Sequence, residues 1–246
     1  MKTKSERFYR RGFWILLAGC FLLGCMTLFL LIRGNYFSML AQTMSHDKDS
    51  YDYESNASYI QRSTQFDMLP VQDTDIVFVG DSITARFEWD EYFTDYTVAN
   101  RGIDSDVSEG VLNRLDTIIS QTPEKIFLMI GINDIRQGIA PETTLANYEK
   151  IIDGLMTALP DCQIYVQSIL PVHTSTGIDN TKVQSLNLSL EELAKSKGLT
   201  YLDIYSSVAD SENNFTYTVD GVHPTGEGYA IWTGIVEDVL KKQLLY

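Results

Sequence analysis

Cysteine, proline and basic residues are scarce in this sequence, and each shortage excludes a class of protein. Only three cysteines occur in 246 residues, and two of them, Cys20 and Cys25, lie in one apolar segment. Cys162 therefore has no partner for a disulfide in the rest of the chain, which excludes a disulfide-stapled scaffold. Six prolines and 16 glycines are too few for a collagen or a low-complexity protein. With 19 Lys and Arg against 33 Asp and Glu, the net charge of −14 argues against a nucleic-acid-binding protein.

The few basic residues are concentrated at the N-terminus. Residues 1–33 carry six basic groups and one acid, whereas residues 34–246 carry 13 basic and 32 acidic groups and a net charge of −19. Residues 13–32 carry no charge, and a helix of that length spans roughly 30 Å, the thickness of a bilayer's hydrocarbon core. Basic flanks of membrane spans stay in the cytoplasm. The sequence therefore predicts a cytoplasmic basic segment at residues 1–12, a transmembrane signal anchor at 13–32 and an extracytoplasmic remainder.

Two other interpretations of the apolar segment were weighed. A cleavable signal peptide has a shorter apolar region followed by an Ala-x-Ala-like site, and this segment is longer and has no such site. Leu17-Ala18-Gly19-Cys20 resembles a bacterial lipobox, which makes a lipoprotein anchored at Cys20 the alternative to a transmembrane anchor. Residues 21–32 stay apolar, however, whereas mature lipoproteins usually turn polar soon after the lipidated cysteine. The transmembrane anchor and the lipoprotein both predict a protein on the cell membrane that faces outward.

The remainder of the chain alternates between strand and helix patterns. Residues 33–69 are expected to form a tether and a lead-in helix, and residues 70–246 one folded domain. Apolar runs of strand length occur at residues 76–79, 96–99, 126–130, 164–166 and 199–202. Between and after them lie apolar stripes with helical spacing, for example Leu145, Tyr148, Ile152, Leu155 and Leu159. This alternation predicts an α/β domain of three layers, flavodoxin-like, with a mostly parallel five-stranded sheet.

Three short motifs lie where such a sheet would bind a ligand, beyond the carboxyl ends of its strands. Gly80-Asp81-Ser82 follows the first predicted strand, Gly131-Ile132-Asn133-Asp134 follows the third, and Asp220-Gly221-Val222-His223 precedes the last predicted helix. Each motif alone is a weak signal, but their joint occurrence in this order is informative.

With these motifs the sequence resembles the SGNH, or GDSL-type, hydrolase family, in its acetylhydrolase-like esterase branch. The likeness runs from about Asp75 to Trp232, and Ile83 stands where the family name has leucine. The four family blocks are Gly80-Asp81-Ser82-Ile83-Thr84, the glycine of Asn100-Arg101-Gly102, Gly131-Ile132-Asn133-Asp134 and Asp220-Gly221-Val222-His223-Pro224. The resemblance implies a catalytic triad of Ser82, Asp220 and His223. It also implies an oxyanion hole of Ser82, Gly102 and Asn133.

The residue chemistry supports the same roles. Because a residue before proline is pushed away from helical geometry, the segment from Asp220 to Pro224 should be a loop. In such a loop the Asp220 carboxylate can bind Nδ1 of His223 and leave Nε2 free to accept the proton of Ser82. Gly102 and Asn133 would supply N–H donors to the oxyanion. The alternatives are structural: Ser82 as a helix cap, Gly102 as an ordinary turn glycine, and the Asp220–His223 segment as a surface turn.

The remaining candidates are weaker. His173 and Arg101 are candidate substrate contacts, although an exposed, silent histidine and a packed surface arginine explain them as well. No His-x-x-x-His motif or cysteine cluster is present, so we expect neither a metal ion nor another cofactor.

These observations predict an extracytoplasmic serine esterase. The family resemblance implies that it removes short acyl groups, above all O-acetyl, from a carbohydrate. The expected partners are a small-molecule or glycan ester and, through the N-terminal helix, the membrane, but no nucleic acid. Three alternatives stay open: a lysophospholipase or thioesterase of the same fold, a glycan O-acetyltransferase, and a surface-tethered glycan-binding module without catalysis. The sequence assigns no oligomeric state.

Overall fold

The structure, a computed structural model, describes residues 51–70 and 73–243. The predicted cytoplasmic segment, the anchor at residues 13–32 and the lipobox cysteine lie outside the described residues, as does most of the tether. Within the described ranges, no helix has the length and apolar character needed to cross a bilayer.

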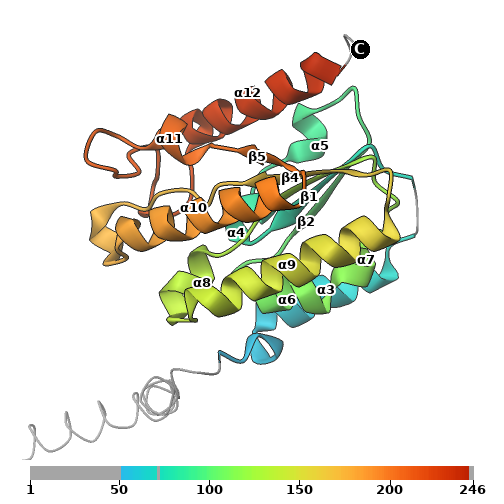
Figure 1. Cartoon of the computed structure of the whole chain (residues 1–246), viewed down its shortest axis with the longest axis horizontal. Coiled ribbons are helices and arrows are strands. Elements are labelled where there is room, and N and C mark those ends of the chain that lie inside the picture. Colours follow the sequence, from blue (N-terminus) through green and yellow to red (C-terminus); the bar gives the residue numbers. More distant parts are fainter. Residues whose placement is uncertain (1–50, 71–72, 244–246) are drawn as a thin grey trace, which may run out of the picture. The chain divides into compact units, whose positions relative to one another are not determined.

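Parallel strands alternate with helices throughout the described domain (Figure 1). The elements are η1 (Tyr53–Ser55), α3 (Ala57–Met68), β1 (Ile76–Gly80), α4 (Ser82–Ala85), α5 (Trp89–Tyr92), β2 (Val98–Gly102), α6 (Ser108–Asn113), α7 (Leu115–Ile119), β3 (Lys125–Met129), α8 (Ile132–Gln137), α9 (Pro141–Ala158), β4 (Gln163–Gln167), η2 (Thr174–Thr176), α10 (Asn180–Ser196), β5 (Thr200–Leu202), α11 (Tyr205–Val208) and α12 (Gly226–Gln243).

The five strands form one parallel sheet in the order β2-β1-β3-β4-β5, which is the order of flavodoxin-like doubly wound domains. Figure 1 shows α5 and α12 on one face of the sheet and α6, α7 and α9 on the other. Right-handed crossovers explain this division, because the chain moves outward from β1 in one direction to β2 and in the opposite direction to β4 and β5. The predicted α/β class and five-stranded parallel sheet are thereby confirmed.

The central strands are buried on both faces, as their unbroken apolar runs predict. In β1 the side chains of Ile76, Val77, Phe78 and Val79 are all fully buried. The rings of Phe78 and Phe127 stack at 5.0 Å between centroids, which joins β1 to β3 within the core. Because β1 lies between two strands under helices on both faces, its carboxyl end is held rigidly.

Two details differ from the sequence pattern. The second strand was expected at residues 96–99 but runs from Val98 to Gly102, because backbone pairing with β1 continues through polar residues as far as Gly80 opposite Gly102. Val107, Val111, Leu115 and Ile118 have the spacing of one helical face, yet the helix breaks at Arg114 into α6 and α7. The buried guanidinium of Arg114 points into the domain at this break.

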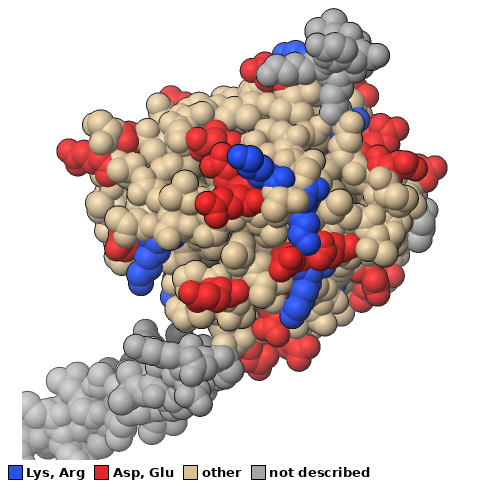
Figure 2. Space-filling view, in the orientation of Figure 1, with Lys and Arg blue, Asp and Glu red and all other residues tan. Residues whose placement is uncertain are grey.

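The surface agrees with the acidic composition. Figure 2 shows carboxylates spread over the visible face, with several Lys and Arg side chains among them. Lys197, for example, forms ion pairs with Glu149 at 3.2 Å and with Asp153 at 2.6 Å. Exposed pairs of this kind contribute little to stability.

Candidate active site

Ser82 lies at the carboxyl end of the central strand β1. It is the first residue of the short helix α4, and its neighbour Asp81 caps that helix by accepting a hydrogen bond from the Ile83 N–H at 2.9 Å. Ser82 is therefore at the turn where a strand meets a helix, at the sheet edge where ligands bind in such folds. Its exposed fraction is 7%, so the hydroxyl is largely shielded from water.

Three of the predicted residues make one continuous chain of hydrogen bonds. Nε2 of His223 lies 2.8 Å from Oγ of Ser82, and Nδ1 of His223 lies 2.6 Å from Oδ2 of Asp220. The imidazole thus separates the hydroxyl from the carboxylate, although Ser82 and His223 are 141 residues apart in the sequence. This is the geometry in which a histidine can accept a serine proton while an aspartate orients the ring.

The loop that carries Asp220 and His223 is held by short-range contacts. Oδ1 of Asp220 accepts hydrogen bonds from the N–H groups of Val222 at 3.0 Å and His223 at 2.9 Å. The Thr218 hydroxyl donates to the His223 carbonyl at 2.8 Å and accepts from the Gly221 N–H at 3.0 Å. No helix includes residues 220–224, as the proline rule predicts.

The hydrogen bonds around Asp220 keep it ionised. Desolvation by its surroundings raises the pKa of the Asp220 carboxyl, but the backbone N–H of His223, the His223 ring and the Val222 N–H together lower that pKa well below its ordinary value. A permanently charged carboxylate is suited to hold the Nδ1–H tautomer of His223 and to stabilise the imidazolium that forms when the ring accepts a proton.

Gly102 is required by packing, and its N–H is already engaged. A Cβ at this position would lie 2.3 Å from the Ala85 nitrogen and 2.8 Å from the Asp81 carbonyl oxygen, so only glycine lets β2 approach the turn around Ser82. The Gly102 N–H donates to Oδ1 of Asn100 at 2.9 Å. This hydrogen bond weighs against the predicted use of the Gly102 N–H as an oxyanion donor.

Asn133 lies beside a loop that the sequence analysis did not single out. Its Nδ2 donates to the Asp106 carbonyl at 2.9 Å, which uses one of its two amide hydrogens. Ser105, the preceding residue, has a φ of 63°, in the left-handed region that favours glycine. The Ser105 N–H donates no hydrogen bond to any of the described residues. Nothing in the sequence marks a serine for this backbone geometry.

Comparison with known proteins decides the family. A profile of the GDSL-like lipase/acylhydrolase family matches residues 78–231, more than half of the chain. The chain belongs to this family. It is an ester-hydrolysing enzyme, as the resemblance in the sequence implied.

Solved structures of similar proteins agree with this assignment, and one curated protein is similar to the chain in sequence. A protein from Streptococcus pneumonia, provisionally described as a platelet activating factor, is 29% identical with a TM-score of 0.70, over 74% of this chain and 92% of that one. A GDSL-like lipase from Bacteroides thetaiotaomicron is 26% identical with a TM-score of 0.65, over 76% and 98%. An N-acylneuraminate cytidylyltransferase from Escherichia coli is 26% identical over 187 residues. Those residues are 74% of this chain but 43% of that protein, so the chain spans less than half of that relative's length.

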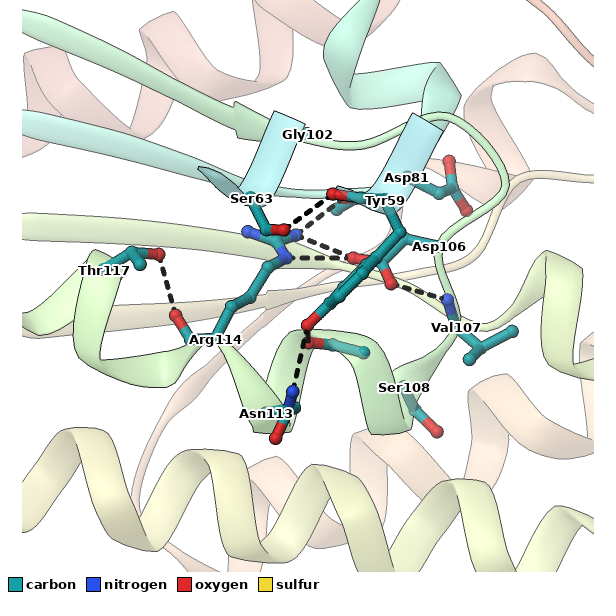
Figure 3. Close-up of polar contacts among 12 residues, drawn as sticks. Tyr59, Ser63, Asp81, Gly102, Asp106, Val107, Ser108, Asn113, Arg114 and Thr117 are labelled. Atoms are coloured by element: carbon teal, nitrogen blue, oxygen red, sulfur yellow. Dashed lines mark hydrogen bonds and ion pairs between the residues drawn. The ribbon is translucent and has the colours of Figure 1, made fainter. Parts of the chain in front are cut away.

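Buried charges of this acylhydrolase brace the loops around Ser82. Asp106 is fully buried and pairs with Arg114, whose Nη2 lies 2.9 Å from the Asp106 carboxylate and also donates to the Gly80 carbonyl (Figure 3). Asp134, also fully buried, accepts from the Ser108 N–H and from the Thr144 hydroxyl. Burial raises the pKa of Asp106 to about 6, even though Arg114 lowers it. Burial likewise raises the pKa of Asp134.

The two candidate substrate contacts lie in different places. The His173 N–H donates to the Gly221 carbonyl at 2.8 Å, and His173 shares a shallow cavity of about 440 Å³ with Asp220 and Val219. His173 is therefore beside the loop that carries Asp220 and His223. Arg101 is not: its exposed fraction is 4% and its guanidinium lies 4.8 Å from the centre of the Phe66 ring. The burial of its side chain under α3 weighs against the predicted contact between Arg101 and substrate.

Metal ligation has no candidate among residues 51–70 and 73–243, where no group of three His, Cys, Asp or Glu side chains could hold an ion. The chemistry available at this site is that of a nucleophile, a base and N–H donors.

Proposed function

We propose that this acylhydrolase is a serine esterase in which Ser82 is the nucleophile, His223 the general base and Asp220 the group that orients the base. The observation that carries the proposal is the unbroken series of hydrogen bonds from Asp220 through the His223 ring to Ser82, at 2.6 and 2.8 Å. Both distances are within the range over which a proton can pass between nucleophile and base.

The reaction has two halves. Oγ of Ser82 attacks the ester carbonyl while Nε2 of His223 accepts the hydroxyl proton, and the imidazolium then returns that proton to the departing alcohol. Water attacks the resulting acyl-serine in the same way, with His223 again accepting and returning a proton. Asp220 stays ionised throughout, in keeping with its lowered pKa.

The carbonyl oxygen gains negative charge in both halves and needs N–H donors. The Ser82 N–H and the second amide hydrogen of Asn133 fill two of these positions, as the sequence predicted. For the third, the Ser105 N–H is a better candidate than the Gly102 N–H, because Gly102 already donates to Asn100. Nδ2 of Asn133 donates to the carbonyl of Asp106, the residue after Ser105, and this contact with the same loop supports the pairing of Asn133 with Ser105.

The substrate proposed is a short-chain acyl ester, principally an O-acetyl group on a carbohydrate, hydrolysed outside the cytoplasm by a membrane-anchored enzyme. The acyl and carbohydrate preferences rest on the resemblance to the acetylhydrolase-like branch. An open site favours a bulky alcohol portion, since the side chains of Asp220 and His223 are 48% and 19% exposed. The large negative charge of residues 34–246 disfavours polyanionic glycans.

The test is hydrolysis of p-nitrophenyl acetate by the full-length chain in detergent, together with esters from butyrate to palmitate. We expect turnover that falls with acyl length and decreases at least about 10³-fold in Ser82→Ala. Ser189→Ala, which removes an exposed hydroxyl from α10, is the matched control and should behave as wild type. Turnover that persists in Ser82→Ala would contradict the triad, and a preference for palmitate would contradict the short acyl group.

The location has its own test. Membrane fractionation of cells that express the full chain should recover it with the membrane, and external protease should degrade the domain in intact spheroplasts. If Cys20→Ser alone releases the protein from the membrane, the lipoprotein alternative replaces the transmembrane anchor.

A further inference from the structure

The segment that precedes the family match packs onto the loop of Ser105. The match begins at residue 78, whereas η1 and α3 occupy residues 53–55 and 57–68. Tyr53, Tyr59 and Phe66 from this segment form a small buried cluster with Ile103 and Val107, separate from the main core. Ile103 and Val107 are the two ends of the loop that contains Ser105, and both are fully buried.

Hydrogen bonds from the same segment also join it to the loop of Ser105 and to α6. The Tyr51 hydroxyl donates to the Ser105 carbonyl at 3.3 Å, which is the peptide oxygen of the residue with left-handed geometry. The Tyr59 hydroxyl donates to the Gly110 carbonyl at 3.3 Å and accepts from Nδ2 of Asn113 at 3.3 Å. Figure 3 shows Tyr59 reaching across to Asn113 on α6, beside Asp106 and Arg114. The segment is thus bound both to the loop and to the helix that follows it.

Phe66 covers the ion pair between Arg114 and Asp106, which anchors the loop of Ser105. Its ring centre lies 5.7 Å from the Arg114 guanidinium and 4.8 Å from that of Arg101. Arg114 in turn binds Asp106 in the loop and the Gly80 carbonyl at the end of β1. An aromatic face over guanidinium groups attracts them and excludes water from them. Away from water the attraction between the charges of Arg114 and Asp106 is stronger.

We propose that residues 51–68 are a positioning element for the oxyanion site, with Phe66 as its principal positioning residue; this inference rests on the proposed function. The element packs on Ile103 and Val107 and, through Phe66, covers the Arg114 side of the Asp106–Arg114 pair, and so holds the Ser105 N–H and Asn133 in position relative to Ser82. Its effect falls on the step in which charge develops on the carbonyl oxygen. Loss of Phe66 therefore lowers kcat more than it raises KM.

The experiment compares Phe66→Ala with Phe93→Ala in the full-length chain, with p-nitrophenyl acetate as substrate. Phe93 is the matched control because its ring is 6% exposed, against 4% for Phe66, and packs in the main core against Phe78. Both changes should lower Tm. Only Phe66→Ala should lower kcat, by about 10- to 100-fold, with KM changed less than about threefold, because misplacement by about 1 Å costs up to about 10²-fold.

Two further measurements separate positioning from general destabilisation. Phe66→Trp keeps a ring over the two guanidinium groups and should restore most of the kcat, whereas Phe66→Leu keeps an apolar side chain without a ring and should not. A trifluoromethyl ketone forms a tetrahedral adduct with Ser82. Its affinity should fall in Phe66→Leu by the same factor as kcat/KM.

The outcomes are distinct. An inactive wild type overturns the proposed function. If the wild type is active, and Phe66→Ala and Phe93→Ala lose kcat equally when assayed well below the Tm of both variants, the positioning element alone is overturned. If Phe66→Ala does not fold, Phe66→Leu replaces it with the same expected split between kcat and KM, and an unchanged kcat there also overturns the inference.

Discussion

Two loops meet at Ser82, and they are held in opposite ways. The loop from Asp220 to His223 is fixed mainly by neighbours in sequence, since the carboxylate of Asp220, the Thr218 hydroxyl and the backbone of residues 217–225 bind one another. One backbone hydrogen bond, from His173 to Gly221, comes from a distant part of the chain. The loop from Ile103 to Val107 makes its contacts with Tyr51, Phe66, Arg114 and Asn133, which come from three other parts of the chain.

The first loop carries the groups that move protons, and the second lies beside the proposed donors that stabilise charge on the oxyanion. A base and its orienting carboxylate need one short distance between them, and a tight turn can supply it. Oxyanion donors must instead point at the carbonyl oxygen of a substrate bound to Ser82, which follows a different strand. Only the packing of the tertiary structure can fix their positions relative to Ser82. Three substitutions test this contrast and a fourth tests the buried carboxyl beside Ser82; they are given from the largest expected effect to the smallest.

The largest effect is expected for Asp220→Asn. Replacing the carboxylate by an amide removes the charge that holds the Nδ1–H tautomer of His223, and an equivalent change in a serine triad lowers turnover about 10⁴-fold. The measurement is kcat for p-nitrophenyl acetate, with the surface change Asp90→Asn as control. A loss below about tenfold would mean that the loop does not act as a triad.

Asn133→Ala tests the second loop. Removing one oxyanion donor typically lowers kcat about 10²- to 10³-fold, and KM should change little because the donor acts on developing charge. Asn187→Ala is the control, since that buried carboxamide binds the Ile169 N–H and carbonyl at a site without catalytic groups. Equal kcat values for the two variants would remove Asn133 from the oxyanion hole.

Thr218→Val tests whether the first loop is held locally. The change removes the hydroxyl that binds the His223 carbonyl and the Gly221 N–H but keeps the side-chain shape. We expect kcat to fall about tenfold, less than a full 1 Å misplacement would cause. Thr218→Ser retains the hydroxyl and should restore the rate. An unaltered kcat in the valine variant would show that tertiary packing supports this loop too.

Asp81→Asn concerns stability and should have the smallest effect. Burial raises the pKa of Asp81 from 3.8 to about 7, so between those values the folded state binds a proton that the unfolded state lacks. This contribution is present below the unfolded pKa and is lost as pH rises through about 7, so stability should fall with pH. Urea unfolding at about pH 5 and about pH 8 should show a smaller fall in Asp81→Asn than in wild type. An unchanged pH dependence would contradict the raised pKa.

The sequence predicted most of the sheet and the three residues that touch at its edge. Apolar runs located β1 and β3 closely, because strands buried on both faces must be apolar throughout. It misplaced β2, where the polar residues Asn100 and Arg101 belong to the strand only through pairing with β1. The sequence predicts a substrate contact at Arg101, and no sequence pattern reveals that Phe66 covers this side chain.

By itself the sequence determined the α/β class, the family blocks and the residues of the Asp220–His223 turn, since periodicity and a proline at position 224 act over a few neighbours. Tertiary structure alone decided that the Gly102 N–H is engaged by Asn100, that Ser105 adopts left-handed geometry and that residues 51–68 pack on its loop. The physical reason is that these features depend on which backbone atoms and side chains meet after folding, across separations of tens of residues. The local propensities of the sequence do not encode contacts between residues so far apart.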